Sequence, residues 1–159
     1  MKSDDEPCRL PTAAGLLRRL AALLYDVFLV LAIWMAIGFA AQLIAGDGTN
    51  QVVDGEVRTN SLFGALLFSL MCASSAAFYI GFWTRGGQTL GMLAWRIRAQ
   101  SSNGGPMTAG QALLRFLCAW PAFFLFGLGY LWLYLDPNGD AAHDRLSRTR
   151  VVTLPRRER

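Results

Sequence analysis

The stretch RRLAALLYDVFLVLAIW, residues 18–34, decides the fold. Two arginines open an apolar run, and one carboxylate, Asp26, lies inside it. The 19 residues that follow, Val27–Ala45, carry no charge. About 20 apolar residues in a helix cross the hydrocarbon core of a bilayer, and the run exceeds the core of a cleaved signal peptide. It therefore predicts a retained transmembrane helix over residues 16–44.

Two further uncharged runs, Ser61–Thr84 and Phe116–Leu135, reach a similar length. The 159-residue chain is 53% hydrophobic and 16% charged, whereas an average soluble domain is about 25% charged. A domain of this size has too little polar surface to cover three buried helices. The sequence therefore predicts an all-α, helical integral membrane protein. It has two transmembrane helices, the second over residues 61–83, and a third hydrophobic segment.

The charges between these runs predict an orientation. Segments 1–19 and 84–111 are basic, whereas the turn-rich loop 46–60 is net acidic. Cytoplasmic segments carry an excess of arginine and lysine, so we expect a multi-pass protein of the inner membrane with a cytoplasmic N-terminus. The basic residues after residue 135 also favour the cytoplasm. The third segment is therefore either a third transmembrane helix, against this rule, or a re-entrant hairpin or interfacial pair of short helices bent near Pro121 or residues 127–129.

Two short segments with strand patterns bear on this choice. WRIRAQ (95–100) alternates apolar and polar residues, and TRVVTL (149–154) is rich in β-branched residues. If they form a small two-stranded sheet at the cytoplasmic face, both termini lie inside. We expect a cytoplasmic N-terminal tail over residues 1–17, a transmembrane domain over 18–154 and a basic tail over 155–159.

The intramembrane carboxylate Asp26 needs a partner. A charged group at the centre of a membrane helix costs about 2.5–3.5 kcal/mol, and a nearby cation reduces this cost. Arg115 opens the third apolar run, so we predict an Asp26–Arg115 contact or one through Arg19. The contact makes Asp26 a polar clamp between helices; the other hypothesis is an ion- or proton-binding carboxylate.

The C-terminal motif HDRLSRTR contains the single histidine, His143. We expect this segment to lie at the membrane surface. There Asp144 would pair with nearby arginines, which would also bind anionic lipid head groups. The arginines in question are Arg145, Arg148 and Arg150.

A stripe of small residues runs along the second helix at every fourth position. Such stripes let membrane helices pack closely, so we predict a helix-packing face here. It consists of Ser69, Ala73, Ala77 and Gly81.

The sequence contains no phosphate-binding loop, no metal-ligand spacing and no nucleophile motif. The three cysteines are not spaced as metal ligands. We therefore expect no catalytic residues, no metal and no cofactor, and not an enzyme. The net charge of +4 comes from arginines that flank apolar runs, which indicates membrane topology instead of nucleic-acid binding.

Several motifs in order resemble the RDD family of small bacterial membrane proteins. RRLAALLYD supplies the family arginine, Arg19 or Arg18, and the first family aspartate, Asp26. GPMTAGQALLR matches the approach to the last segment and ends at Arg115. The GQTLG segment matches at Gly87, Gln88, Thr89, Leu90 and Gly91. The closing signature matches at His143, Asp144, Leu146, Thr149, Val151 and Val152.

The resemblance covers residues 12–154 and implies that Asp144 is the second family aspartate. Two positions depart from the family pattern: Met92 stands where lysine is common, and Trp95 where glycine is common. The family includes proposed cation/proton exchangers and accessory subunits that organise a membrane partner.

Two functional hypotheses follow. The first is a membrane binding, scaffold or accessory module that docks a larger membrane partner or forms a homo-oligomer. The second is a cation/proton transporter that uses Asp26. Transporters usually need internal repeats around a midplane site, and the chain has no repeat and no second intramembrane acid, so the module is favoured.

Overall fold

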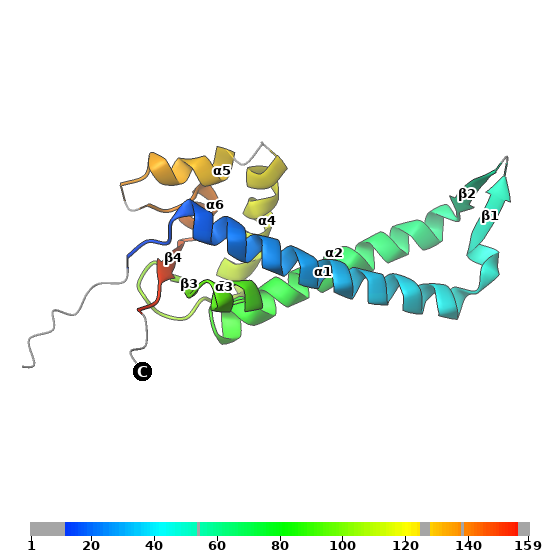
Figure 1. Cartoon of the computed structure of the whole chain (residues 1–159), viewed down its shortest axis with the longest axis horizontal. Helices are drawn as coiled ribbons and strands as arrows, with labels where there is room; N and C mark the ends of the chain where they lie inside the picture. The colour runs from blue at the N-terminus through cyan, green and yellow to red at the C-terminus, as the bar shows by residue number, and fades with distance from the viewer. Residues whose placement is uncertain (1–11, 54, 125–127, 138, 156–159) are drawn as a thin grey trace, which may run out of the picture.

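Two long helices form the frame of the protein. The computed structural model describes residues 12–53, 55–124, 128–137 and 139–155. Helix α1 (Leu16–Ala45) and helix α2 (Ser61–Arg85) pack against each other as a long hairpin (Figure 1). Their bounds lie within two residues of the predicted ends.

Local chemistry explains where these helices begin and end. The Asn60 side chain caps α2 by accepting hydrogen bonds from the backbone N–H groups of Leu62 and Phe63, as helix N-caps commonly do. Helix α1 ends at Gly46, whose φ of 68° suits glycine. Both helices are long and apolar enough to cross a bilayer, and only 6% of the most apolar window of each is buried. The structure is thus mostly helical, with two candidate membrane-spanning helices.

The predicted loop between the helices contains more structure than its composition indicated. A 3-10 turn, Asp47–Thr49, leads into β1 (Asn50–Val53), which pairs antiparallel with β2 (Glu56–Thr59). Gly55 has a φ of 81°, a backbone conformation typical of tight hairpin turns. This hairpin caps the far end of α1 and α2 (Figure 1).

The remaining elements gather at the other end of the helix pair, around the start of α1 and the end of α2 (Figure 1). We refer to them as the compact end. They are α3 (Leu90–Ala94), β3 (Ile97–Ser101), α4 (Ala109–Phe124), α5 (Leu128–Leu131), the 3-10 helix η2 (Trp132–Tyr134), α6 (Ala142–Leu146) and β4 (Thr149–Thr153).

The predicted two-stranded sheet is confirmed. Strand β3 pairs antiparallel with β4, with Ile97 opposite Thr153 and Ser101 opposite Thr149. The chain before α1 joins this sheet, because Ala13 forms a β-bridge with Val152. Residues 12–15, assigned from sequence to the tail, therefore belong to the folded unit, whereas residues 1–11 lie outside the described residues.

The third hydrophobic segment does not form one straight helix over residues 116–135. Helix α4 ends at Phe124 and α5 begins at Leu128, while Pro121 lies inside α4. Helix α4 packs on α2 and on α6, and α5 packs on α4. The chain thus turns back toward β4, although its depth in a bilayer stays a prediction.

The core lies in the compact end, where the two long helices meet the sheet. Its buried apolar members come from α1, α2, α3, β3, α4 and β4 and from two connecting segments. They are Ala14, Ala22, Trp83, Met92, Ile97, Ala99, Met107, Ala112 and Val151.

Candidate functional site: a buried charge cluster beside an apolar cavity

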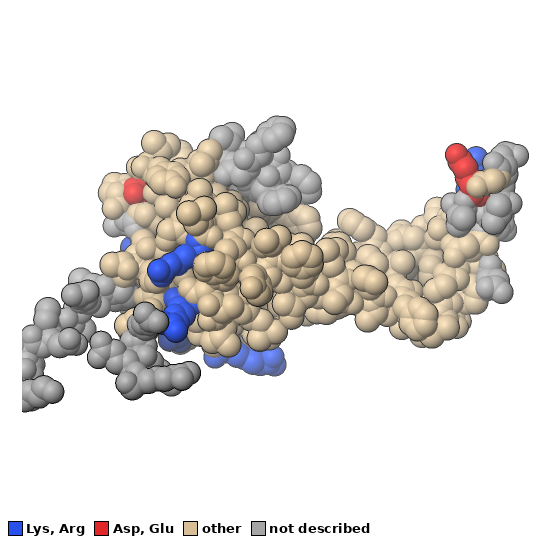
Figure 2. All heavy atoms as spheres, in the orientation of Figure 1, with Lys and Arg blue, Asp and Glu red and all other residues tan. Residues whose placement is uncertain are grey.

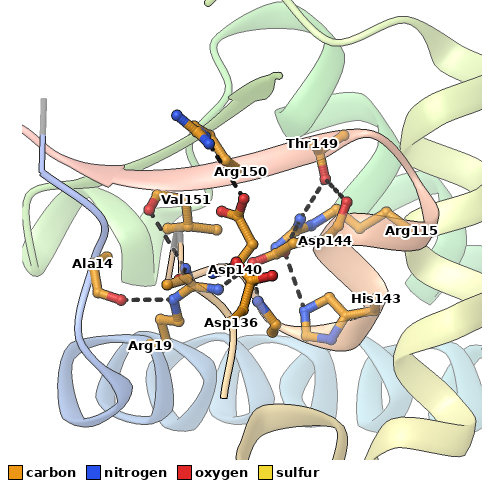
Figure 3. A network of polar contacts seen from close by, with 12 residues as sticks. Ala14, Arg19, Arg115, Asp136, Asp140, His143, Asp144, Thr149, Arg150 and Val151 are labelled. Atoms are coloured by element: carbon orange, nitrogen blue, oxygen red, sulfur yellow. Dashed lines mark hydrogen bonds and ion pairs between the residues drawn. The ribbon is translucent and has the colours of Figure 1, made fainter. Parts of the chain in front are cut away.

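Asp144 is the centre of a buried charge cluster (Figure 3). Its two carboxylate oxygens each form an ion pair, one with Arg19 Nη1 and one with Arg115 Nη1. The backbone N–H of Ala141 donates a third hydrogen bond to Asp144 Oδ2 at 3.1 Å. Asp144 is fully buried and the two arginines are 6% and 4% exposed, so water contributes little to this cluster.

The two arginines bring distant segments together. Arg19, in the first turn of α1, also donates from Nε to the Ala14 carbonyl at 2.9 Å and from Nη2 to the Gly139 carbonyl at 3.2 Å. Arg115, on α4, also donates to Thr149 Oγ1 on β4 at 2.7 Å. One carboxylate on α6 therefore fixes α1, α4 and β4 in one arrangement.

The predicted Asp26–Arg115 contact is wrong, and so is the alternative through Arg19. Asp26 instead accepts a hydrogen bond from Thr89 Oγ1 at 2.5 Å and another from the Gly91 N–H at 2.9 Å. Both donors lie at the start of α3, which returns to α1 after α2. A backbone amide and a hydroxyl thus replace the expected cation.

The predicted surface cluster around Asp144 is also wrong, because Asp144 is buried and its partners come from α1 and α4. Arg145 pairs with Asp136 at 3.2 Å, and Arg150 pairs with Asp140 at 3.3 Å. Arg148 is exposed and forms no ion pair within the described parts of the chain.

His143 is likewise buried, at 3% exposure, and not at the surface as predicted. Its Nε2 lies 3.4 Å from Asp144 Oδ1, and its ring packs edge-on against Tyr130 with centroids 4.9 Å apart. Within the described residues its Nδ1 has no hydrogen-bond partner. Burial lowers the pKa of His143 to about 4, against the opposing effect of Asp144. Burial alone would raise the pKa of Asp144, but Arg115 and Arg19 outweigh it and hold that pKa below 3.8.

These pKa shifts predict lower stability in acid. Between pH 6.5 and about 4 the unfolded chain binds a proton at His143 that the folded chain excludes, so stability falls as pH falls through this range. Each unit of pKa difference corresponds to about 1.4 kcal/mol. We expect the melting temperature in detergent to drop between pH 7 and pH 4.5.

His143→Gln is the matched control, because His143 is the single histidine of the chain. This variant should flatten the pH profile between 6.5 and 4. An identical profile in the variant would show that another group causes the acid sensitivity.

The GGQTLG segment matched in the sequence has a structural role. Gly87 has a φ of 69°, and a Cβ there would lie 2.4 Å from the Ala99 carbonyl oxygen. Gln88 Nε2 donates to the Ile97 carbonyl at 2.8 Å, and Thr89 caps α3 by accepting from the Met92 N–H at 3.2 Å. A Cβ on Gly91 would lie 2.1 Å from the Ala22 carbonyl oxygen. The motif therefore lets α3 approach both β3 and α1 closely.

An apolar cavity of about 260 Å³ lies next to the charge cluster, with walls from α1, α2 and α4. Arg19, Asp26, Arg115 and His143 line it together with six aromatic side chains that sequence reasoning missed. Those aromatic residues are Trp34, Tyr79, Trp83, Phe116, Trp120 and Tyr130. Their type is a usable signal, because buried tyrosine and tryptophan carry a polar tip that needs a partner.

The small-residue stripe on α2 lies apart from this site. Ser69, Ala73 and Ala77 are exposed and Gly81 is half-buried. Helix α1 contacts another face of α2, where Trp34 Nε1 donates to Ser75 Oγ at 3.0 Å. The stripe does not mediate the α1–α2 contact, and a role in packing with another chain stays a prediction.

The fold and the site together define a small helical protein with two candidate membrane-spanning helices and a buried Arg–Asp–Arg cluster. A family model described as the RDD family matches residues 13–148, and the protein belongs to this family. The resemblance seen in the motifs is thereby confirmed. No curated protein and no solved structure matched the chain.

Proposed function

We propose that the protein is a membrane-embedded binding or accessory module and not an enzyme. The observation that carries this proposal is the engagement of both buried carboxylates near the cavity. Each oxygen of Asp26 and each oxygen of Asp144 accepts a hydrogen bond or ion pair from within the chain. Carboxylates held in this way act as clamps between elements, and they are poorly placed to bind and release an ion.

The distribution of exposed charge supports a location in the bacterial inner membrane with a cytoplasmic N-terminus. Most exposed arginines gather at the compact end, whereas the stretches of the two long helices between this end and the β1–β2 hairpin show no charged side chain in this view (Figure 2). The positive-inside rule places the compact end in the cytoplasm, where it would contact anionic lipid head groups. At the compact end the exposed arginines without an ion pair in the described structure are Arg18, Arg85, Arg96, Arg98 and Arg148, and a sixth, Arg58, lies on β2 at the other end.

The module would work in an assembly, as a homo-oligomer or with a larger membrane partner. The exposed stripe Ser69, Ala73 and Ala77 supports this idea, because small residues allow a second helix to approach closely. In mild detergent, light scattering should give a protein mass above that of one 17.5 kDa chain.

The second candidate function is cation/proton transport, which one observation favours. Asp26 lines the apolar cavity, so its carboxylate is near a space that an ion or water could occupy.

Ion flux in proteoliposomes distinguishes the two functions. The purified protein would be given a pH gradient and then sodium, lithium or potassium, with Asp26→Asn in parallel. We expect no cation-dependent proton movement from either protein. Movement in the wild type that is lost in a well-folded Asp26→Asn protein would overturn the module proposal and identify Asp26 as the transport site.

The proposed topology predicts which positions are reached from each side of the membrane. In a background without Cys8, Cys72 and Cys118, single cysteines would replace Thr12, Gly55 and Pro155. Because Thr12 and Thr153 are bonded neighbours, positions 12 and 155 should react with a membrane-impermeant thiol reagent only after lysis. Position 55, at the β1–β2 turn, should react in intact spheroplasts. Reaction of position 155 from outside would exclude this topology.

A further inference from the structure

We propose that the cavity between α1, α2 and α4 binds the oxyanion head group of an anionic amphiphile, whose hydrocarbon chain leaves between α1 and α4. This ligand class deepens the proposed function and rests on it, since a binding module needs an occupant. The inference comes from polar groups that the cavity leaves unused, from its charge and from its apolar walls.

Two residues that line this space carry hydrogen-bond donors without a partner among the described residues. Trp83 is 6% exposed and lines the cavity, and its Nε1–H has no partner in the part of the chain that the structure describes. The Arg115 guanidinium lies over the Trp83 ring, 5.0 Å from the ring centroid. Within the described residues Arg115 bonds only through Nη1, which leaves Nε and Nη2 available. Buried polar groups without partners are rare and require an explanation, and an acceptor-rich ligand supplies one.

The charge of the cluster favours an anion. Arg19 and Arg115 contribute two positive charges and Asp144 one negative charge. His143 is neutral at pH 7, because burial lowers its pKa to about 4. An ionised Asp26, which also lines the cavity, adds a negative charge, but its oxygens are engaged at the start of α3 and pair with neither arginine. Arginine binds phosphate and carboxylate oxygens with its planar fork of donors.

Among anionic head groups, His143 favours a phosphate monoester. Its Nε2 lies 3.4 Å from an Asp144 carboxylate oxygen, and a ring proton on that nitrogen would leave Nδ1 as an acceptor without a partner among the described residues. A singly protonated phosphate offers both an O–H for this nitrogen and oxygens for Trp83 and Arg115. An ionised fatty-acid carboxylate offers only the oxygens.

The walls indicate that the rest of the ligand is hydrocarbon. Apart from the polar groups named above, the lining is mainly aliphatic and aromatic side chains. Three lining residues are partly exposed: Val27 at 39% and Leu31 at 44% on α1, and Trp120 at 38% on α4. The cavity therefore opens sideways between apolar surfaces. Its 260 Å³ is below the roughly 300–1,000 Å³ of sites for drug-sized ligands, so it accommodates a head group and the first methylenes.

The test is native mass spectrometry of the full-length protein in detergent, titrated with dioleoyl phosphatidate, oleate, dioleoyl phosphatidylcholine and inorganic phosphate. We expect phosphatidate to bind at least about tenfold more tightly than phosphatidylcholine, the scale of a lost charge-assisted hydrogen bond. If oleate binds tightly and phosphatidate does not, the ligand is still an anionic amphiphile, and its head group is a carboxylate. If inorganic phosphate binds as tightly as phosphatidate, the hydrocarbon chain contributes nothing, and the proposal of an amphiphilic ligand is overturned.

Three variants keep the test independent of folding. Ala119→Trp fills the cavity, whereas Ala36→Trp, on the exposed face of α1, adds the same bulk outside it. Trp83→Phe keeps an aromatic ring but removes the unused donor. Ala119→Trp and Trp83→Phe should each weaken phosphatidate binding about tenfold or more, and Ala36→Trp should not. If phosphatidate binds both cavity variants as tightly as the wild type, the cavity proposal is overturned. The module proposal is tested separately, by the ion-flux measurement and by the mass of the protein in detergent.

Discussion

Asp144→Asn is expected to destabilise the protein by about 3–5 kcal/mol, because it leaves two buried arginines without a counter-ion. This is a large part of the roughly 5–15 kcal/mol that stabilises a typical protein. The variant should lose most of its folded fraction when it is heated in detergent and analysed by size exclusion. Arg18→Ala, next to Arg19 on α1 but exposed and without an ion pair in the described structure, is the control and should cost at most about 0.5 kcal/mol.

The same charge count predicts the order of stability among variants of Arg19, Arg115 and Asp144. Arg115→Met leaves Arg19 and Asp144 as a balanced pair, and Arg19→Met leaves Arg115 and Asp144. Each arginine variant should therefore be more stable than Asp144→Asn. The reverse order, with either arginine variant less stable than Asp144→Asn, would show that packing and not charge balance dominates this cluster.

Gly91→Ala should produce the second large effect. The added Cβ would lie 2.1 Å from the Ala22 carbonyl oxygen and 2.9 Å from Asp26 Oδ1, so α3 must move away from α1. Overpacking alone costs about 1–3 kcal/mol, and the movement also breaks the Gly91 N–H bond to Asp26. We expect a loss of about 3 kcal/mol or more, measured as a lower melting temperature.

Gly64→Ala is the matched control for this variant. Gly64 lies inside α2 and a Cβ there meets no atom within 4 Å. Alanine favours a helix interior over glycine by roughly 0.5–1 kcal/mol, so this variant should match or exceed the wild type in stability. Equal melting temperatures for Gly91→Ala and the wild type would show that the α1–α3 contact adjusts without cost.

The elements of the fold were largely predictable because their signals are local. Hydropathy marked α1 and α2, alternation of apolar and polar residues marked β3, and β-branched residues marked β4. The loop 46–60 was the exception: its DG pair, Asp54–Gly55, is a hairpin signal that the turn-rich composition obscured. The break between α4 and α5 was expected near Pro121 or residues 127–129, and the structure retains Pro121 within α4.

The residues of the site were predictable, but their pairing was not. Arg19, Asp26 and Arg115 stood out as charges at or within apolar runs, and Asp144 stood out in the closing RDD-like signature. The position of Arg115 at the start of an apolar run suggested it as the partner of Asp26. In the structure α3 returns to α1, and Thr89 and Gly91 donate hydrogen bonds to Asp26 instead. Trp83 and Tyr130 lacked any signal beyond their residue type, since only the meeting of α2, α4 and α5 places them around one cavity.

By itself the sequence determined that this is a helical protein with two apolar helices, a small sheet and RDD-family motifs, because burial preference and backbone propensity act residue by residue. The tertiary structure alone decided that Asp144 binds two arginines and that Asp26 clamps α3. Arg19 and Asp144 are 125 residues apart in the chain. Several cations can reach each carboxylate in principle, and the docking of α1, α4 and α6 selects among them.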